Sequence, residues 1–393
     1  MHKSFKYRLR PTKKQEKILL THIQECRLLY NQLVCARVQG WKNDQTSLSL
    51  YEQQRTLKLM KQQHPEFAQV YSQVLQQVAV RVDLAFKAFF RRVKECHGKA
   101  GFPRYKGQNR YDSITYPQFS NGCRLDEKGL RLGKIGCIRI VQHRLLEGVP
   151  KTCTVTRTAT GKWFATISCD MGDATPKNIP HAHAEGMAKP HHNVSNTDVG
   201  LDVGLEKFAT LSTGEEIPNP RFFRKEEKAL ARAQRKWDKV KKDSHKKREK
   251  ARKVVARVHE RIRNKRHNFA HQESRKLVNC FLMIAIEDLP VNRMVHNRCL
   301  SKSISDAAWS MFRQCITYKA EEAGGVVEPV DPAYTSQDCS QCGHRLKKTL
   351  SDRRHKCPCC GVDMDRDLNA AINILRLGRQ SQVAKLPRSP SGV

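Results

Sequence analysis

Two closely spaced cysteine pairs constrain the C-terminal part of this chain more than any other feature. Cys339 and Cys342 stand in CSQCG, and Cys357 and Cys360 stand in CPCCG, with fourteen residues between the pairs. Two residues between thiolates let a tight turn direct both sulfurs to one ion, and two such turns complete a tetrahedral zinc site. Four thiolates leave no open coordination position, so the predicted zinc is structural. Cys359 breaks the spacing and is not predicted to be a ligand.

Two histidines flank these pairs. His344 and His355 are alternatives that could replace one of the thiolates. The whole chain has 15 cysteines, and its N-terminal segment has no apolar stretch typical of a secretion signal. We therefore expect reduced thiols and metal ligands rather than a disulfide framework.

The balance of charge indicates the class of partner. The 393 residues include 73 Lys and Arg against 38 Asp and Glu, which gives a formal net charge of +35. Such an excess predicts a long polyanionic partner, with nucleic acid favoured over an anionic membrane surface. The longest strongly apolar run, residues 280–286, is far too short to span a bilayer. A hydrophobic content of 39% is enough for a sizeable core, and the length indicates two or three domains.

The first half of the chain combines a strand, a helical block and a β-rich segment. Residues 4–10 alternate apolar and basic side chains, which predicts a half-buried strand ended by Pro11. Thr12 and Gln15 form a capping-box pattern before the first of several helical stretches. Short β-type pieces with glycine turns fill residues 101–170. This order predicts a small all-β module with a helical block inserted after its first strand.

A linker is predicted between the two halves of the chain. Residues 173–196 are rich in Pro, Asn, Gly and His; a flexible linker is favoured over a metal site because no flanking element would fix the ligands.

Residues 221–279 then predict a long basic helical surface that lies along phosphates. Residues 280–289 predict a buried strand ending in acids, and residues 305–323 predict a helix. The tail from Gly378 is predicted to be disordered.

Three acids stand in or beside these patterns. Asp202 lies in GLDVGLEKF, Glu287 ends the strand in IAIEDL, and an aspartate stands in DMDRDLNAAINIL. A single acid of this kind is more often a turn residue or a helix N-cap. A buried carboxylate, however, is costly unless it is paired or bound to a metal. Together the three predict a carboxylate cluster that holds two Mg²⁺ or Mn²⁺ ions for phosphodiester hydrolysis.

The third acid has to be chosen among Asp363, Asp365 and Asp367. Asp363 leaves the cysteine pair and is predicted to lie in a turn or face solvent. Asp365 and Asp367 are two residues apart, so in a segment that enters a helix they cannot share a face. We favour Asp367, which would stand in the first turn of the last helix, and Asp365 is the alternative.

Several neighbouring residues are predicted to lie outside the site. Asp198 should be dispensable, and Asp288 on a strand would point to the opposite face from the acid before it. His267 and His271 are four apart on a predicted helix, but without a third ligand they favour packing or phosphate contacts over a metal site. Two further acids are candidates for outer contacts with the site: Glu206 and Asp306.

The order of these motifs resembles the TnpB (OrfB) family of proteins encoded by insertion sequences. GLDVGL, IEDL, the two cysteine pairs and DRDLNAAINI follow the order of the RuvC-type nuclease core of that family, which type V CRISPR effectors and Fanzor proteins share. YRLRPTKKQEKILL and FPRYKG in the first half also resemble it. The resemblance implies that Asp202, Glu287 and Asp367 are the catalytic acids and the ligands of two Mg²⁺ or Mn²⁺ ions.

The resemblance also implies a multidomain α+β fold. Its parts would be a wedge β-barrel similar to oligonucleotide-binding barrels, a helical recognition domain inserted in it, an RNase H-like (RuvC) nuclease domain, and a zinc ribbon inserted before the last helix of the nuclease domain. The implied boundaries are residues 1–11 and 99–172 for the wedge, 12–98 for the recognition domain, 173–196 for the linker, 197–332 and 362–377 for the RuvC-like domain, 333–361 for the ribbon and 378–393 for a disordered basic tail.

The implied activity is cleavage of double-stranded DNA beside a short transposon-adjacent motif, directed by a guide RNA (ωRNA) from the same element. One protein per guide RNA and a cytoplasmic, nucleoid-associated location in a bacterium are further expectations. Two alternatives stay open: a nuclease-inactive RNA-guided repressor, and a strand-transfer transposase that uses three carboxylates. The intact acids disfavour the repressor, and the lack of a convincing helix-turn-helix pattern disfavours the transposase.

Overall fold

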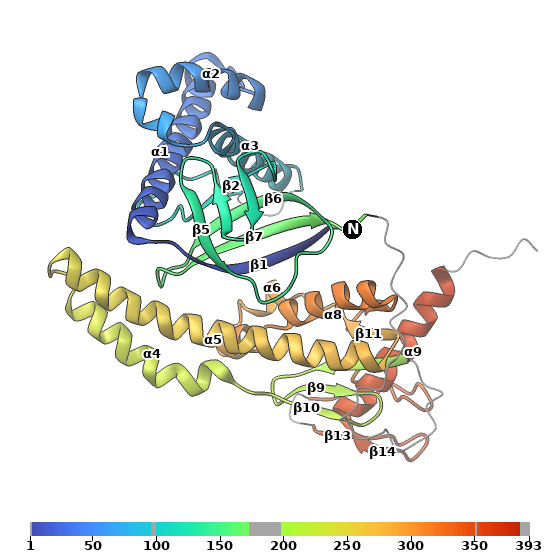
Figure 1. Ribbon diagram of the computed structural model, residues 1–393. Helices are drawn as coiled ribbons and strands as arrows, with labels where there is room; N and C mark the ends of the chain where they lie inside the picture. Colours follow the sequence, from blue (N-terminus) through green and yellow to red (C-terminus); the bar gives the residue numbers. More distant parts are fainter. Residues whose placement is uncertain (1, 96–99, 173–197, 350–351, 386–393) are drawn as a thin grey trace, which may run out of the picture. The chain divides into compact units, whose positions relative to one another are not determined.

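The computed structural model describes residues 2–95, 100–172, 198–349 and 352–385 (Figure 1). The chain divides near residue 174 into two compact units. The linker predicted for residues 173–196 lies entirely outside the described residues. Each unit has its own hydrophobic core and combines helices with a sheet, so the predicted α+β organisation is confirmed.

The N-terminal unit is a seven-stranded antiparallel sheet with helices inserted after its first strand. The strand order across the sheet is β2-β6-β7-β1-β5-β4-β3, and among the described residues no ladder joins the end strands β2 and β3. The elements in chain order are β1 (His2–Arg10), α1 (Lys13–Asp44), α2 (Leu50–Gln63), η1 (Pro65–Gln69), α3 (Ser72–Lys94), β2 (Ser113–Tyr116), β3 (Cys123–Asp126), β4 (Gly129–Leu132), β5 (Gly136–Val141), β6 (Val149–Arg157) and β7 (Trp163–Asp170).

The helical block begins as the sequence predicts. The hydroxyl of Thr12 accepts a hydrogen bond from the Gln15 backbone N–H at 3.3 Å, and the Gln15 side chain accepts one from the Thr12 backbone N–H at 3.0 Å. This reciprocal pair satisfies two backbone donors that the helix cannot satisfy itself. The predicted capping box of α1 is therefore confirmed.

The second unit is a mixed five-stranded sheet with helices on both faces. The strand order is β10-β9-β8-β11-β12; β8, β11 and β12 run parallel, and β9 and β10 join by antiparallel pairing. The elements are β8 (Asp198–Val203), β9 (Lys207–Leu211), β10 (Glu216–Pro218), α4 (Phe222–Lys239), α5 (His245–Cys280), β11 (Met283–Glu287), α6 (Val291–Met294), α7 (Ser301–Ala307), α8 (Trp309–Ala323), β12 (Val326–Val330), β13 (Arg354–Lys356), β14 (Asp363–Asp365) and α9 (Arg366–Lys385).

Alternate residues of β8 and β11 face different helices. Side chains of one parity, such as Leu201 and Ile286, belong to the core shared with α5 and α8. Residues of the other parity face α9: Ala285 packs in a cluster with residues of α9. Strand β8 and helix α9 come very close together at Gly200, because a Cβ there would lie 2.1 Å from the carbonyl oxygen of Ala371. The glycine therefore lets α9 lie directly on the sheet.

Helix α9 extends further than predicted. The sequence predicts a disordered tail from Gly378, but α9 continues to Lys385, so this prediction is wrong for the helical part of the tail. Gly378 lets the helix stay on the sheet, since a Cβ there would lie 2.5 Å from that of Ala285. Beyond it, Ser381 and Lys385 donate hydrogen bonds to the carboxylate of Glu328, which is buried on β12. These contacts order a segment whose composition alone is typical of a tail.

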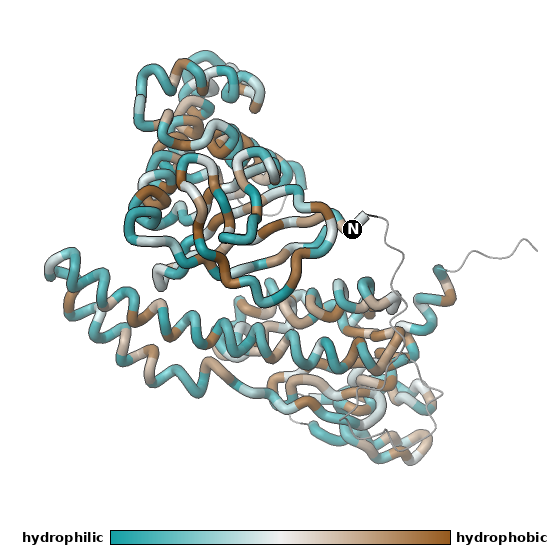
Figure 2. The backbone as a smooth tube through the Cα atoms, viewed as in Figure 1, coloured by the Kyte–Doolittle hydropathy of each residue, from teal (hydrophilic) through white to brown (hydrophobic). Residues whose placement is uncertain are grey.

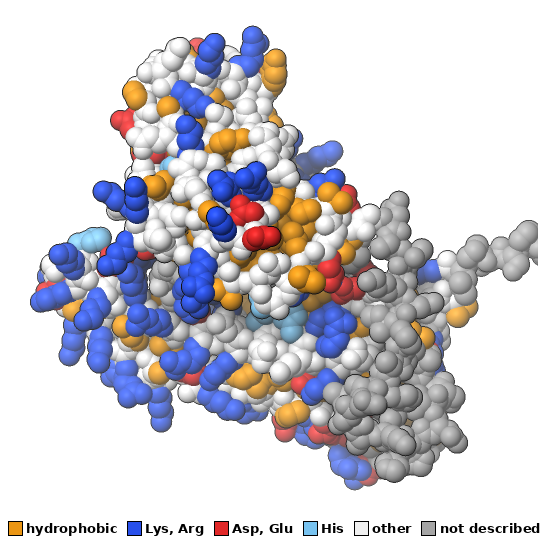
Figure 3. Space-filling view, in the orientation of Figure 1, with side chains coloured by type: hydrophobic (Ala, Val, Ile, Leu, Met, Phe, Trp, Pro, Cys, Tyr) orange, Lys and Arg blue, Asp and Glu red, His pale blue; other side chains and the backbone are white. Residues whose placement is uncertain are grey.

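Helices α4 and α5 form the predicted basic helical surface. They pack through a small apolar cluster and are otherwise mainly hydrophilic (Figure 2). Helix α5 carries 13 Lys and Arg against three acids, and basic side chains gather along the visible face of the pair (Figure 3). Asp306 anchors this pair: it accepts hydrogen bonds from the Phe223 backbone N–H at 2.8 Å and from Arg266 at 2.7 Å. No helix of the described residues combines the length and apolarity needed to cross a membrane.

Candidate metal sites

The four predicted cysteines come together in the structure. The Sγ atoms of Cys339, Cys342, Cys357 and Cys360 all lie within 4.8 Å of one another. Backbone N–H groups of the turn, first that of Cys360, lower the pKa of Cys357 to about 6. Four sulfurs clustered in two tight turns are what a structural zinc ion requires, so the residues present fit the ion. Cys359 is exposed and does not belong to the group.

The two alternative histidine ligands lie outside this group. The His355 Nδ1 atom contacts Lys348 Nζ, and burial, followed by the charge of Lys348, lowers the pKa of His355. His344 contributes its backbone carbonyl, which accepts a hydrogen bond from the Cys339 N–H at 2.9 Å. Neither imidazole is part of the cluster of ligand atoms.

The three predicted acids lie on the α9 side of the sheet, at the carboxyl ends of its parallel strands. Asp202 is in β8 and Glu287 ends β11, each at the parity that faces α9, and Asp367 stands in the first turn of α9. Adjacent parallel strands bring their carboxyl ends to one edge of a sheet, where ligand sites of open α/β sheets occur. The fold thus brings together three acids that are separated by up to 165 residues in the sequence.

The acids affect one another electrostatically. Burial, then the negative charges of Glu287 and Asp367, raise the pKa of Asp202 well above its usual value, while Arg366 works in the opposite direction. Burial also raises the pKa of Glu287, whose side chain is only 9% exposed, although the hydroxyl of Thr335 donates to its Oε1 at 2.6 Å. Buried carboxylates that repel one another are a recurring feature of functional sites.

Asp365 has a different partner set from Asp367. Its Oδ1 accepts hydrogen bonds from the backbone N–H groups of Asp367 at 2.9 Å and Leu368 at 3.2 Å, which caps α9. Its Oδ2 accepts from Lys207 Nζ at 3.2 Å. Burial opposes these contacts, but together they lower the pKa of Asp365. The Asp367 carboxylate lies 3.4 Å from the Arg366 guanidinium and does not cap the helix.

Two asparagines of α9 tie the helix to the cysteine ribbon. Asn369 Oδ1 accepts from the Ser340 backbone N–H at 2.9 Å, and its Nδ2 donates to the carbonyl of Asp338 at 2.8 Å. Asn373 Nδ2 donates to the same carbonyl at 2.7 Å and to that of Thr335 at 3.0 Å. Both asparagines are fully buried. The ribbon and the helix that carries Asp367 are therefore held as one structure.

The carboxylates are less tightly grouped than the cysteines. Within the part of the chain that the structure describes, only the cysteines form a set of ligand atoms that all lie within 4.8 Å of one another. Three like charges repel at short range unless a cation lies between them. Carboxylate oxygens are nevertheless the donors that Mg²⁺ and Mn²⁺ prefer, so the donor set fits these ions. Burial, and after it the neighbouring negative charges, raise the pKa of Asp202, and a cation bound there would offset those charges.

The neighbouring acids have other partners. Asp198 accepts from Arg379 Nε at 2.9 Å, and Asp288 is paired with Arg313. Glu206 lies 2.8 Å from Arg353 and is exposed. None of the three is among the main causes of the raised pKa of Asp202.

The two helical histidines contact each other. The Nε2 atoms of His267 and His271 lie 3.3 Å apart, and the Tyr318 hydroxyl lies 3.3 Å from His271 Nδ1. They are not part of a group of three metal-ligating side chains among the described residues.

Sequence reasoning missed three residues that contact the acids. Thr335 holds Glu287, Arg366 offsets the charge of Asp367, and Lys207 holds Asp365. Only Arg366, adjacent to Asp367, could have been found from the sequence. The other two come from segments that the fold alone brings near.

Comparisons with known proteins identify the family. Three family models match: one described as "Probable transposase" over residues 179–298, of the OrfB group, one described as "Cas12f1-like, TNB domain" over residues 309–374, and one described as "Helix-turn-helix domain" over residues 1–46. A "Putative RNA-guided DNA endonuclease" of Streptomyces pristinaespiralis is 34% identical, over 96% of this chain and 89% of its own length. The chain belongs to the TnpB (OrfB) family.

Another relative and a solved structure resemble this TnpB-family chain along most of its length. A protein of Escherichia coli (strain K12), with the same description, is 31% identical over 95% of this chain and 92% of its own. A cryo-EM structure of a CRISPR-Cas12f ternary complex is 13% identical, with a TM-score of 0.36 over 91% of this chain and 81% of that chain. At a TM-score below 0.5, this likeness does not decide the fold.

The description of the N-terminal model differs from the structure of this family member. The match named for a helix-turn-helix covers residues 1–46. In the structure, residues 2–46 form the strand β1 and the single long helix α1, not two short helices joined by a turn. The matching sequence therefore forms a strand and a helix here.

Proposed function

We propose that this chain is an RNA-guided, divalent-metal-dependent DNA endonuclease. The observation that supports the proposal is that Asp202 and Glu287 lie at the carboxyl edge of the sheet on the face covered by α9, and that the charges of Glu287 and of Asp367, in the first turn of α9, raise the pKa of Asp202. Two relatives that match nearly the whole chain carry the description "Putative RNA-guided DNA endonuclease". The second unit would then be an RNase H-like (RuvC) nuclease domain with an inserted zinc ribbon.

The acids would bind the ions that the reaction needs. Two Mg²⁺ or Mn²⁺ ions held by Asp202, Glu287 and Asp367 would activate water and stabilise the leaving oxygen of the phosphodiester. Thr335 orients Glu287 through the hydrogen bond to its Oε1. Arg366 moderates the negative charge of the cluster. Asp365 fixes the start of α9, and the ribbon fixes its first turns, so both position Asp367 without contacting the substrate.

The partners would be a guide RNA from the same element and double-stranded target DNA. Base pairing between guide and target would select the sequence, while the protein would recognise a short transposon-adjacent motif and the shape of the duplex. The net charge of +35 and the basic α4–α5 pair support binding to phosphates. In this proposal the N-terminal unit is the wedge with its inserted recognition helices.

The first test is reconstitution of the native complex. The protein is purified together with RNA transcribed from its own locus, the RNA is sequenced, and the complex is mixed with DNA that matches the guide segment. We expect double-strand cleavage with Mg²⁺ that EDTA abolishes. Asp202→Asn should bind the same RNA and leave the DNA intact. A wild-type complex that binds its target without cleavage would instead identify an RNA-guided repressor.

A strand-transfer reaction is the second candidate. The matched model described as "Probable transposase" favours it, and the same three carboxylates could serve transesterification. The two reactions differ in product, because hydrolysis leaves broken target ends and strand transfer joins donor ends to a target. A labelled transposon-end duplex added to the reaction decides between them: joined products would replace the nuclease proposal.

A further inference from the structure

An exposed aromatic cluster lies at the C-terminal end of α3 in the N-terminal unit. Phe90 of α3 and Phe102, which follows α3 in the chain, are 59% and 48% exposed. Phe89 lies between them, with its ring centroid 5.2 Å from that of Phe90 and 5.0 Å from that of Phe102. Tyr105, three residues after Phe102, is 55% exposed. Large apolar side chains that gather at a surface mark a site of interaction.

The segment that follows α3 is held in place by side chains of the helices. Residues 100–107 form neither helix nor strand. The Lys106 backbone N–H donates to Asn31 Oδ1 at 2.7 Å, and the Lys106 carbonyl accepts from Asn31 Nδ2 at 3.0 Å. Nearer to α3, the Arg92 guanidinium donates to the Gly101 carbonyl at 3.0 Å. Because both ends of the segment are fixed, a ligand that binds its rings pays little to order them.

The two stretches that carry these rings are strongly basic. Residues 84–95 and 100–110 include seven Lys and Arg and a single acid, Glu95. The basic residues are Lys87, Arg91, Arg92, Lys94, Arg104, Lys106 and Arg110. Exposed rings among cations are typical of surfaces that bind single-stranded nucleic acid.

A pocket beside the segment continues this surface. Its volume is about 440 Å³, within the roughly 300–1,000 Å³ typical of ligand sites, and Leu84 of α3 and Lys106 both line it. Arg81 and Arg110 add two cations to its walls, against one acid, Asp112. The pocket therefore offers a positively charged site for a phosphate next to the exposed rings.

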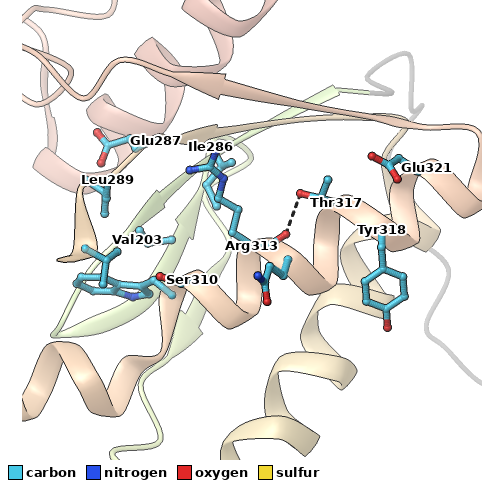
Figure 4. A pocket seen from close by; sticks show the side chains of 12 residues that line it. Val203, Ile286, Glu287, Leu289, Ser310, Arg313, Thr317, Tyr318 and Glu321 are labelled. Carbon is cyan, nitrogen blue, oxygen red and sulfur yellow. Dashed lines mark hydrogen bonds between the residues drawn. The ribbon is translucent and has the colours of Figure 1, made fainter. Parts of the chain in front are cut away.

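An exposed ring of the second unit has different surroundings. Tyr318 is 39% exposed and lines a groove together with Glu287 and Glu321, and its ring points away from Glu287 (Figure 4). Arg313, the cation of that lining, is paired with Asp288. A ring between acids does not attract a polyanion, so the second unit offers a natural contrast to the cluster on α3.

The chemistry of the α3 surface indicates its occupant. Aromatic side chains stack with unpaired bases irrespective of their identity, and cations hold the phosphates between them. A second copy of this chain is disfavoured, because it would bring the same net charge of +35 to the interface. In the proposed function, the guide RNA is bound before the target DNA arrives. RNA can therefore cover the apolar rings throughout, whereas DNA covers them only during a reaction.

We propose that this surface binds an unpaired segment of the guide RNA. Bases of that segment stack on Phe90, Phe102 and Tyr105. A phosphate of the same segment lies in the pocket lined by Lys106 and Arg110. This inference rests on the proposed function, because it requires the guide RNA, and deepens it by assigning RNA contacts to the N-terminal unit.

Ultraviolet crosslinking of the complete RNA–protein complex, without DNA, tests the contact. The protein is purified with RNA from its own locus and irradiated, and the crosslinked peptides are identified by mass spectrometry. We expect RNA-linked peptides that contain Phe90, Phe102 or Tyr105. Crosslinks at these residues that form only to added target DNA would assign the surface to DNA and overturn the inference.

Two variants separate stacking from charge. Tyr105→Leu keeps an apolar side chain without the ring, and should weaken guide-RNA binding about tenfold, as for one stacked base, with an unchanged dependence on salt. Arg110→Gln should reduce the slope of log affinity against log salt by about 0.7, the value for one phosphate of a single strand. Tyr318→Leu is the matched control and should change neither quantity. Affinities are measured over a salt series high enough to make dissociation measurable.

The outcomes distinguish this inference from the proposed function. A wild-type affinity for Tyr105→Leu would show that no base stacks there, and an unchanged salt slope for Arg110→Gln would remove the phosphate from the pocket. Either result leaves the nuclease function intact, whereas failure of any RNA to copurify with the wild type contradicts both. Thermal unfolding checks that the variants fold. If Tyr105→Leu is destabilised, Phe90→Leu gives the same readout from the helix.

Discussion

One carboxylate oxygen of Asp365 accepts the backbone N–H of Asp367 at 2.9 Å, so one aspartate holds the start of the helix that carries the other. The same oxygen also accepts the Leu368 N–H. Asp365 therefore has its hydrogen-bonding capacity committed to the helix N-terminus and to Lys207. The negative charges of both aspartates raise the pKa of Asp202, that of Asp367 more strongly than that of Asp365. We therefore propose that Asp365 caps the helix and that Asp367, two residues later, binds the metal.

Substitution of these two aspartates should separate catalysis from stability. Asp367→Asn should lower single-turnover cleavage by at least about 100-fold, because removal of even an indirect support of a metal site costs about 10–100-fold. Asp365→Ala should lower the free energy of unfolding by about 1 kcal/mol through loss of the helix cap. Its cleavage rate should fall by only about tenfold, the lower end of the cost of losing an indirect support, since the cap acts on the position of Asp367 alone.

The measurements are cleavage rates with saturating Mg²⁺ and thermal unfolding of each variant. Asp365→Asn is the matched control, because asparagine also caps helices well and should restore most of the lost stability. An Asp365→Asn variant as inactive as Asp367→Asn would show that Asp365 itself binds the metal.

The raised pKa of Asp202 predicts how stability depends on pH. Folded Asp202 holds its proton more tightly than the unfolded chain, whose aspartates have a pKa of about 3.9. The free energy of unfolding contributed by this group therefore falls as the pH rises from about 3.9 through the raised folded pKa. In EDTA at neutral pH, Asp202→Asn should be more stable than the wild type, because asparagine carries no charge to bury.

The difference in unfolding temperature between Asp202→Asn and wild type is measured from pH 5 to pH 8. It should shrink as the pH falls toward the unfolded pKa, and Mg²⁺ should stabilise only the wild type. Asp288→Asn, at an exposed acid paired with Arg313, is the control and should show no such advantage. A destabilised Asp202→Asn in EDTA at neutral pH would contradict the repulsion inferred for the site.

The strand positions of Asp202 and Glu287 and the clustering of the cysteine pairs could be predicted because their signals are local. Asp202 and Glu287 stand at the ends of strands whose apolar pattern is evident in the sequence, and the CxxC spacing needs no knowledge of the fold. Thr335 could not be predicted, since it reaches Glu287 from 48 residues away through the packing of the ribbon. Asn369 and Asn373 resemble ordinary helix residues until their contacts with the ribbon are seen.

The end of α9 shows why local composition predicted a disordered tail where the structure has a helix. A glycine followed by polar residues is typical of a helix end, so Gly378 predicts a tail. In the structure, Gly378 allows α9 to lie close to the sheet. The following turns are held by a hydrogen bond from Lys385 to the buried carboxylate of Glu328. The energetic reason lies on β12, about 50 residues earlier, and leaves no mark in the sequence near residue 378.

Gly200 should be essential for docking of α9. A Cβ at this position would lie 2.1 Å from the Ala371 carbonyl oxygen and 2.7 Å from the Leu375 nitrogen, both backbone atoms that cannot move alone. Gly200→Ala should lower the free energy of unfolding by about 3 kcal/mol or more, at the upper end of overpacking costs. Cleavage should fall as well, because α9 positions Asp367.

Urea unfolding and single-turnover cleavage of Gly200→Ala give the two readouts. Gly107→Ala is the control, since nothing lies within 4 Å of an added Cβ there and the backbone is not left-handed. If Gly200→Ala cut DNA at the wild-type rate with unchanged stability, the close packing of α9 on β8 would not exist.

Zinc removal should inactivate the protein through Asp367. Cys339→Ser should lose the one zinc ion expected per chain, whereas Cys359→Ser should retain it, because Cys359 lies outside the four-sulfur group. Loss of zinc frees the ribbon, and the hydrogen bonds of Asn369 to Ser340 and Asp338 would no longer hold the first turns of α9. Zinc content is measured with a chromogenic chelator, and cleavage is measured with excess Mg²⁺. We expect Cys339→Ser to bind RNA but to cut at least about 10-fold more slowly, as for other indirect supports of a metal site. A zinc-free variant with full activity would show that the ribbon does not position the last acid.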